Sequence, residues 1–154
     1  MYILVILGVI ISVLFAGMTG DKGGASLVPC VDIAALLLIL VVVIPVMASM
    51  GMLKDLNLAF KLTLGKGKAD NLPDLKRAKL AMTYLIRATL FAGTVGTLVG
   101  AIQVLAFYKE MLALTAGLGV AICPLLYAFV IAIVLLPLEA RLERKIVEYM
   151  ESGE

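Results

Sequence analysis

The sequence predicts an all-α integral membrane protein, with a single membrane domain over residues 1–154 that crosses the bilayer four times. Three observations support this fold class. First, 63% of the residues are hydrophobic and the mean hydropathy is +1.13, which lies outside the range of water-soluble domains. Second, the chain contains four apolar runs, and about 20 residues suffice for one crossing. Third, the polar residues between these runs are too few for a separate soluble domain.

The first predicted helix covers about residues 2–19, an apolar and uncharged stretch. No basic residue precedes it, and residues 17–20 form a poor signal-peptidase site, so we favour an uncleaved helix over a signal peptide. The glycine-rich residues 20–24 predict a turn after it.

The second predicted helix covers residues 32–64. Asp32 opens it, where the helix dipole favours a carboxylate. The apolar run can span the bilayer, and we expect Pro45 to bend it because proline removes a backbone hydrogen bond. Beyond Lys54 the spacing of apolar residues predicts that the helix continues along the membrane surface.

The largest polar stretch, residues 54–80, indicates the topology. It carries seven Lys and Arg residues against three Asp residues, whereas the competing loops carry only Lys22 and Lys109. The positive-inside rule therefore places residues 54–80 in the cytoplasm. Four crossings then leave both termini cytoplasmic.

The third predicted helix covers residues 74–107, and its first two turns should be cytoplasmic. Residues 71–74, NLPD, are typical of a helix start. Arg87 is the one charge of this helix near the membrane. We expect its side chain to extend to the cytoplasmic headgroups, with a functional intramembrane charge as the alternative.

The fourth predicted helix covers residues 112–136. After Pro137, an amphipathic cytoplasmic tail helix is expected over residues 138–151. Its apolar stripe would bundle with other tails in an oligomer or lie on the headgroups in a monomer, and the residues alone do not choose between the two.

One face of the third predicted helix is nearly bare of side chains. At about 100° per residue this face comprises Gly93, Gly96, Thr97 and Gly100, with Gln103 at its edge. Small residues let backbones approach closely, so a packing groove between two helices is the favoured interpretation and a pore lining is the alternative. Ala121 and Ala128 belong to a second small-residue face on the fourth helix.

Residues 93–103, GTVGTLVGAIQ, resemble the penultimate membrane helix of the MotA/TolQ/ExbB proton-channel family, in which a G-x-x-G-T-[LV]-x-G pattern lines the channel. Residues 31–56 resemble the second helix of MotA and its exit, and residues 117–142 resemble the final helix. The resemblance implies a homo-oligomeric inner-membrane ring, expected to be a pentamer, around a single-helix partner of the MotB/ExbD/TolR type. In that family the partner carries the proton-accepting Asp.

The resemblance places the channel threonine of the third helix at Thr97. The final helix departs from the family pattern, because Leu125 occupies the second threonine position and Val120 stands where ExbB and TolQ have a glutamate. Flagellar stators also hold a large helical domain between their second and third crossings. This chain has about 27 residues there, so a flagellar torque generator is not expected.

Other functional classes find little support in the sequence. The chain contains no His and no paired membrane carboxylates, so we expect no enzyme. Cys30 and Cys123 lie in separate segments, so no metal site, cofactor or disulfide is expected. The net charge of +2 comes from basic residues at membrane edges and predicts no nucleic-acid binding. The leading hypothesis is the channel subunit of an ion-driven complex, and the alternative is a non-conducting ring that holds a partner helix or lipid.

Overall fold

The computed structural model describes residues 33–64 and 71–151, and within these ranges the chain is helical with no β-strand. The helices are α2 (Ile33–Ser49), α3 (Leu53–Leu64), α4 (Leu72–Phe107), α5 (Met111–Ala121) and α6 (Cys123–Glu151). The predicted helix over residues 2–19, the turn at residues 20–24 and the helix start at Asp32 lie outside the described residues.

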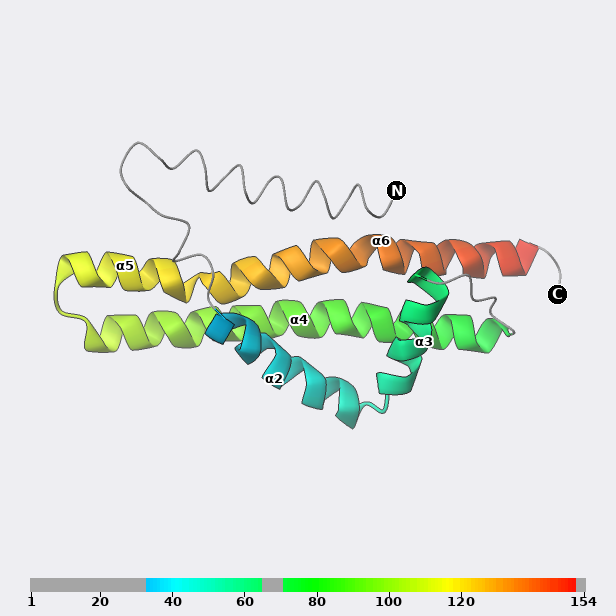
Figure 1. The fold of residues 1–154 in the computed structure, drawn as a ribbon, viewed down its shortest axis with the longest axis horizontal. Helices are drawn as coiled ribbons and strands as arrows, with labels where there is room; N and C mark the ends of the chain where they lie inside the picture. The colour runs from blue at the N-terminus through cyan, green and yellow to red at the C-terminus, as the bar shows by residue number, and fades with distance from the viewer. Residues whose placement is uncertain (1–32, 65–70, 152–154) are drawn as a thin grey trace, which may run out of the picture.

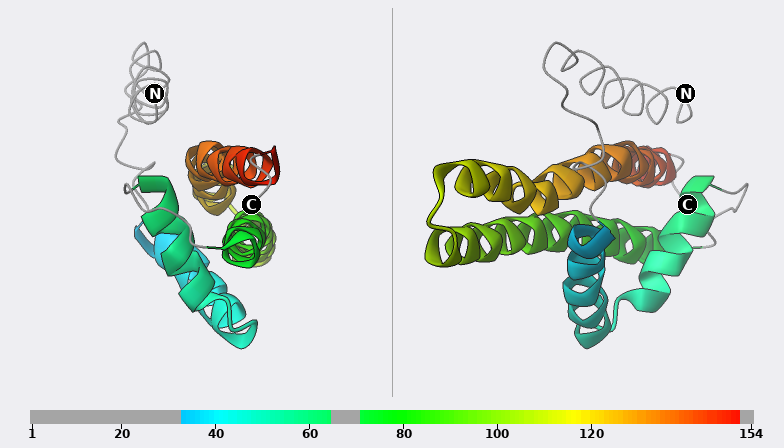
Figure 2. Two further views of the ribbon diagram at one scale, coloured as in Figure 1. Left: turned by 90° about the vertical axis from the view of Figure 1, so that its right-hand side faces the viewer. Right: turned by 60° about the vertical axis from the view of Figure 1, so that its left-hand side comes forward.

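An antiparallel pair of long helices forms the centre of the structure. The helix α4 runs in one direction, and α5 followed by α6 returns along it (Figure 1). The helices α2 and α3 lie on one flank of this pair (Figure 2). Two clusters of buried apolar residues hold the parts together: one joins α3 to the pair and the other joins α2 to it.

Two helical segments are long and apolar enough to cross a membrane. They are α4, with 36 residues, and α5 with α6 counted as one span of 41 residues. The bent pair of α2 and α3 makes a third candidate if it counts as one span. At 1.5 Å per residue α4 is about 54 Å long, so it extends well beyond a hydrocarbon core of about 30 Å. The chain is thus all-helical in its described part and has the helices of a membrane-embedded protein.

The segment expected as one helix over residues 32–64 is divided by a sharp turn. The helix α2 ends at Ser49, and α3 leaves it at an angle of 107°. Gly51 has a φ of 69°, its N–H donates to the Ala48 carbonyl at 2.9 Å, and the next N–H donates to the Met47 carbonyl at 3.2 Å. This is the Schellman motif, which favours glycine because the left-handed conformation strains other residues. The sharp turn in this segment is therefore at Gly51 and not at Pro45, which lies inside α2.

The last predicted membrane helix also differs from expectation, because it is interrupted at Ile122 between α5 and α6. Pro124 is the second residue of α6 and has no N–H to donate to the carbonyl four residues earlier. Proline is tolerated in the first turn of a helix, where that bond is not needed. The chain therefore restarts its hydrogen-bond ladder just before this proline.

Beyond the break, α6 continues through Pro137 to Glu151, so the expected tail helix is the last part of the same helix. The first part of its apolar stripe packs within the chain: Leu138 and Leu142 are each 0% exposed and join a core with residues of α3 and α4. Met150, at the end of the stripe, is 55% exposed.

Candidate functional site

The small residues of α4 form a close crossing with the end of α5 and the start of α6. A Cβ atom added to Gly93 would overlap the Cβ of Ala128 and lie 2.8 Å from the Pro124 carbonyl oxygen. A Cβ added to Gly100 would lie 3.2 Å from the Cβ of Ala121. Only glycine permits such an approach at Gly93, because real Cβ atoms do not come within 3.0 Å of other heavy atoms. We call this crossing the seam.

Thr97 lies in the seam and connects the two helices by a hydrogen bond. Its Oγ1 accepts the backbone N–H of Leu125 at 3.2 Å, and the same N–H also lies 3.1 Å from the Ile122 carbonyl oxygen. The first N–H groups of a helix have no partner within it, so Thr97 acts as a capping residue supplied by a neighbouring helix. Thr94 on the same helix instead donates to the Leu90 carbonyl.

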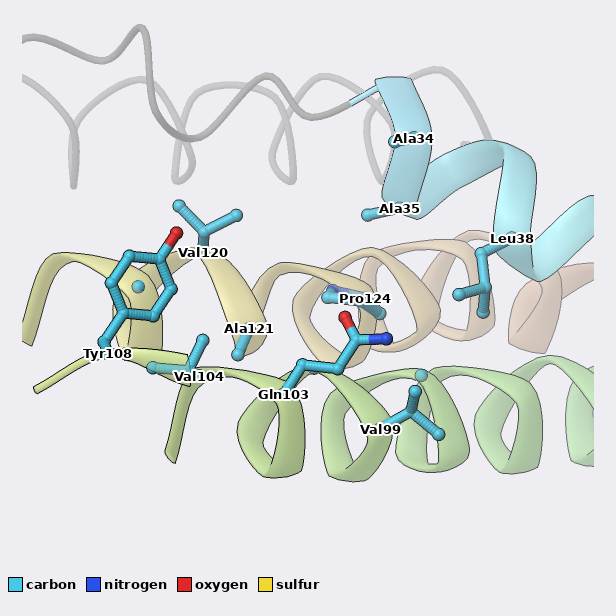
Figure 3. A pocket seen from close by; sticks show the side chains of 13 residues that line it. Ala34, Ala35, Leu38, Val99, Gln103, Val104, Tyr108, Val120, Ala121 and Pro124 are labelled. Carbon is cyan, nitrogen blue, oxygen red and sulfur yellow. The ribbon is translucent and has the colours of Figure 1, made fainter. Parts of the chain in front are cut away.

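A cavity of about 380 Å³ lies beside the seam, between α2, α4 and the junction of α5 with α6. Gly96, Gly100 and Ala121 form part of its wall, and the Gln103 carboxamide projects from α4 toward Pro124 (Figure 3). The other lining side chains are apolar apart from Tyr108. Within the described ranges, no three residues among His, Cys, Asp and Glu lie together as metal ligands would. The cavity therefore offers one amide and one phenol in an apolar wall.

The structure divides the predicted site residues into two neighbouring groups. Gly93, Thr97, Leu125 and Ala128 lie within the seam, whereas Gly96, Gly100, Gln103 and Ala121 also line the cavity. The glycine face of α4 thus contacts both α5 and α6 of the same chain. Thr97 and Leu125 are both only partly buried in the single chain. Part of each residue therefore remains accessible from outside the seam.

Polar contacts at the other end of the pair are absent from the sequence-based prediction. Lys79 pairs with Glu143 at 2.7 Å, and the Thr83 hydroxyl donates to the Glu139 carboxylate. Lys79 and Thr83 are four residues apart on α4, and Glu139 and Glu143 are four residues apart on α6. Because the two helices are antiparallel, the two contacts lie one helical turn apart along the pair. Matching spacings of this kind are a signal that the sequence does contain.

A second missed contact fixes the end of α3. Lys145 Nζ donates to the Leu62 carbonyl at 2.7 Å, and Arg141 Nη1 donates to the Thr63 carbonyl at 3.1 Å. The last carbonyls of a helix lack partners within it and carry partial negative charge, so cations are favoured there. The charged face of α6 thereby holds α3 against the pair.

A scan against protein-family models found no match, and neither the curated proteins nor the solved structures gave a significant match.

Proposed function

We propose that the chain is the channel subunit of an ion-driven inner-membrane complex of the MotA/TolQ/ExbB kind, with protons as the expected ion. In this proposal each subunit crosses the membrane four times and keeps both termini in the cytoplasm. The subunits assemble into a pentameric ring around a single-helix partner of the MotB/ExbD/TolR type. The partner contributes a proton-accepting Asp, and the ring contributes hydroxyls and small residues.

The observation that supports this proposal is the contact between Thr97 and Leu125. The resemblance to the family pairs a threonine of the third helix with a threonine of the final helix at the channel. In this chain the two corresponding positions meet, with 3.2 Å between the Thr97 Oγ1 and the Leu125 nitrogen. The pair also lies next to the cavity that holds Gln103.

Proton transfer across an apolar centre needs a continuous series of hydroxyls or waters, because an ion without partners there costs several kcal/mol or more. Thr97 supplies one hydroxyl. Leu125 supplies hydrocarbon at the same level, and an apolar constriction excludes water and closes. In this mechanism the isolated ring is closed, and the partner's carboxyl group completes the path.

One observation favours a second candidate function, a non-conducting ring that holds a partner helix or lipid. The Thr97 hydroxyl already has a structural task, because it accepts a backbone N–H at the start of α6. Together with the leucine at position 125, this capping role accounts for the threonine without any ion path.

Proton flux in proteoliposomes, followed with a pH-sensitive dye, distinguishes the two functions. We expect the parent protein alone to be ion-tight and Leu125→Thr to raise proton leak several-fold, because a second hydroxyl replaces the constriction. Adding Thr97→Val to Leu125→Thr should abolish the gained leak, whereas adding Thr97→Ser should retain it.

Thr94→Val is the matched control in the same Leu125→Thr background, because Thr94 bonds only within its own helix and is exposed. It should leave the leak unchanged. Circular dichroism of each variant separates loss of conduction from loss of the fold. Rapid flux through the parent protein would contradict the closing role of Leu125, and a tight Leu125→Thr variant would favour the non-conducting ring.

A further inference from the structure

A second cavity lies between α2 and α4, on a different part of the molecule from the seam. Its volume is about 400 Å³, and it shares no lining residue with the cavity that holds Gln103. Val42 and Val46 line it from α2, Met50 lines it from the turn after α2, and Phe91 and Val95 are among its lining residues on α4. We call it the α2–α4 groove.

The groove has two distinct ends. The corner between α2 and α3 packs near Tyr84 and Ala88, because Met52 and these two residues all contact one buried cluster. The end that holds Met50, Tyr84 and Arg87 therefore lies where α2 gives way to α3. We expect this end at the depth of the headgroups, because an amphipathic helix such as α3 lies along the membrane surface. From Tyr84 to Val95 the groove follows α4 for about 16 Å at 1.5 Å per residue. One leaflet contributes about half of a hydrocarbon core of about 30 Å, so the groove has the length of one leaflet.

Arg87 is the single charged residue that lines the groove, and Tyr84 is the one other polar side chain there. Within the described ranges neither side chain takes part in the recorded ion pair or in a hydrogen bond. Arg87 is exposed. A guanidinium ion at the edge of hydrocarbon needs an anion, and phosphate suits its planar arrangement of donors.

Within the described residues no carboxylate pairs with Arg87: Asp55 lies in the first turn of α3 and Glu139 accepts the Thr83 hydroxyl, and neither forms an ion pair with it. The stretch over residues 33–49 contains no Asp or Glu, and neither does the stretch over residues 75–107. A second copy that packed these surfaces into the groove would bring no carboxylate to Arg87. Residues 2–17 also contain no Asp or Glu. The phosphate of a lipid is the anion present at headgroup depth.

We propose that the α2–α4 groove binds an anionic phospholipid of the leaflet in which α3 lies, with one acyl chain between the helices and its phosphate at Arg87. Tyr84 stands beside the phosphate, at the depth where the amphipathic rings of tyrosines are enriched. The binding site is independent of conduction and is compatible with a channel and with a non-conducting ring.

Native mass spectrometry of the protein in nanodiscs measures this binding. The bilayer contains phosphatidylcholine with a small fraction of phosphatidylglycerol, and lipids retained per protein are counted. We expect Arg87→Gln to weaken phosphatidylglycerol binding at least tenfold, since it removes the charge-assisted hydrogen bonds from the guanidinium to the phosphate. Arg87→Lys should weaken it less. Arg77→Gln, an exposed arginine of α4 outside the groove, is the matched control and should bind as the parent does.

Two further measurements locate the acyl chain. Ala88→Phe fills the groove and should reduce retention of both lipids, whereas Arg87→Gln should affect only the anionic one. A photoreactive phenylalanine analogue at Phe91, in the otherwise unchanged protein, should form adducts with lipid. Unchanged phosphatidylglycerol retention in Arg87→Gln would overturn the proposal. An adduct at position 91 with a second copy or with residues 2–19 would also overturn it.

Discussion

At the scale of single residues, the glycines of α4 differ in how much space they leave. Gly93 faces Ala128 and the backbone of Pro124, whereas the atom nearest to a Cβ at Gly96 is the end of the Leu38 side chain, at 2.9 Å. Backbone cannot yield as a flexible side chain can. We therefore expect Gly93→Ala to lower the free energy of unfolding by about 1–3 kcal/mol, the usual effect of overpacking, and Gly96→Ala to lower it less. Thermal unfolding in mild detergent, followed by circular dichroism, measures both.

Gly119→Ala is the control for this series. A Cβ at Gly119 would meet no atom within 4 Å, and alanine has a higher helix propensity than glycine by about 1 kcal/mol. This variant should melt at or above the temperature of the parent. If the Gly93→Ala variant unfolds at the same temperature as the parent, the helices can move apart at the seam without loss of stability.

At the scale of secondary-structure elements, the attachment of α3 depends on two cations of α6. Arg141→Gln combined with Lys145→Gln replaces both cationic donors to the last carbonyls of α3 by shorter, neutral side chains. Such interactions contribute about 0.3–1 kcal/mol each at exposed helix ends and up to about 2 kcal/mol when partly buried. We expect amide hydrogens of α3 to exchange roughly tenfold faster, as a loss of about 1.4 kcal/mol implies.

Hydrogen–deuterium exchange with mass spectrometry resolves the peptides of α3 from those of α4. Arg144→Gln, an exposed neighbour on the same helix, should leave the exchange of α3 unchanged. Equal exchange in the double variant and the parent would mean that the apolar contacts of Ala59 and Leu62 suffice to hold α3.

The helices that the sequence predicts well are those with long uniform apolar runs. The third predicted helix, residues 74–107, differs from α4 (Leu72–Phe107) by two residues at its start. The prediction is close because the hydropathy and the NLPD start both indicate this helix. The turn at Gly51 is not predicted, since a single glycine inside an apolar run leaves no periodic signal and the sequence indicates Pro45 as the cause of a bend. Pro137 was interpreted as a helix end, although α6 passes through it.

The partners of the small-residue face could not be derived from its composition. The pattern predicts close contact with a helix or a pore, but the register of α4 against α5 and α6 decides which. That register is set by several contacts far apart in the chain, from the Lys79–Glu143 pair to the contact of Gly100 with Ala121. The contacts of Thr97 with Leu125 belong to the same register. Only the folded pair shows that one alignment satisfies all of them.

At the scale of the whole molecule, the proposed ring must use surfaces other than the seam. Beyond the α2–α4 groove, the outer face of α4 carries exposed apolar side chains with spacings of four and three residues, at Leu98, Ile102 and Leu105. This spacing is typical of helix–helix contacts. We expect native mass spectrometry in mild detergent to give an oligomer, with five copies as the expected number.

Leu98→Ala combined with Ile102→Ala should shift this oligomer toward smaller species, because van der Waals packing drives association between membrane helices. Ile133→Ala, on the exposed surface of α6, is the control. A parent protein that stays monomeric in several mild detergents would contradict the ring.

The orientation of the molecule in the membrane follows from where its charges lie. The start of α4, the end of α6 and all of α3 lie at one end of the structure (Figure 1), and residues 54–64, 76–79 and 141–145 there carry eight Lys and Arg residues. The opposite end, between α4 and α5, carries Lys109. Because the positive-inside bias acts on short segments next to membrane helices, we expect the α3 end in the cytoplasm.

In a background with Ala at Cys30 and Cys123, Lys61→Cys should react with a membrane-impermeant thiol reagent only in inverted vesicles, and Lys109→Cys only in intact cells. Labelling of Lys61→Cys in intact cells would reverse this orientation, and it would place the phosphate bound at Arg87 in the outer leaflet.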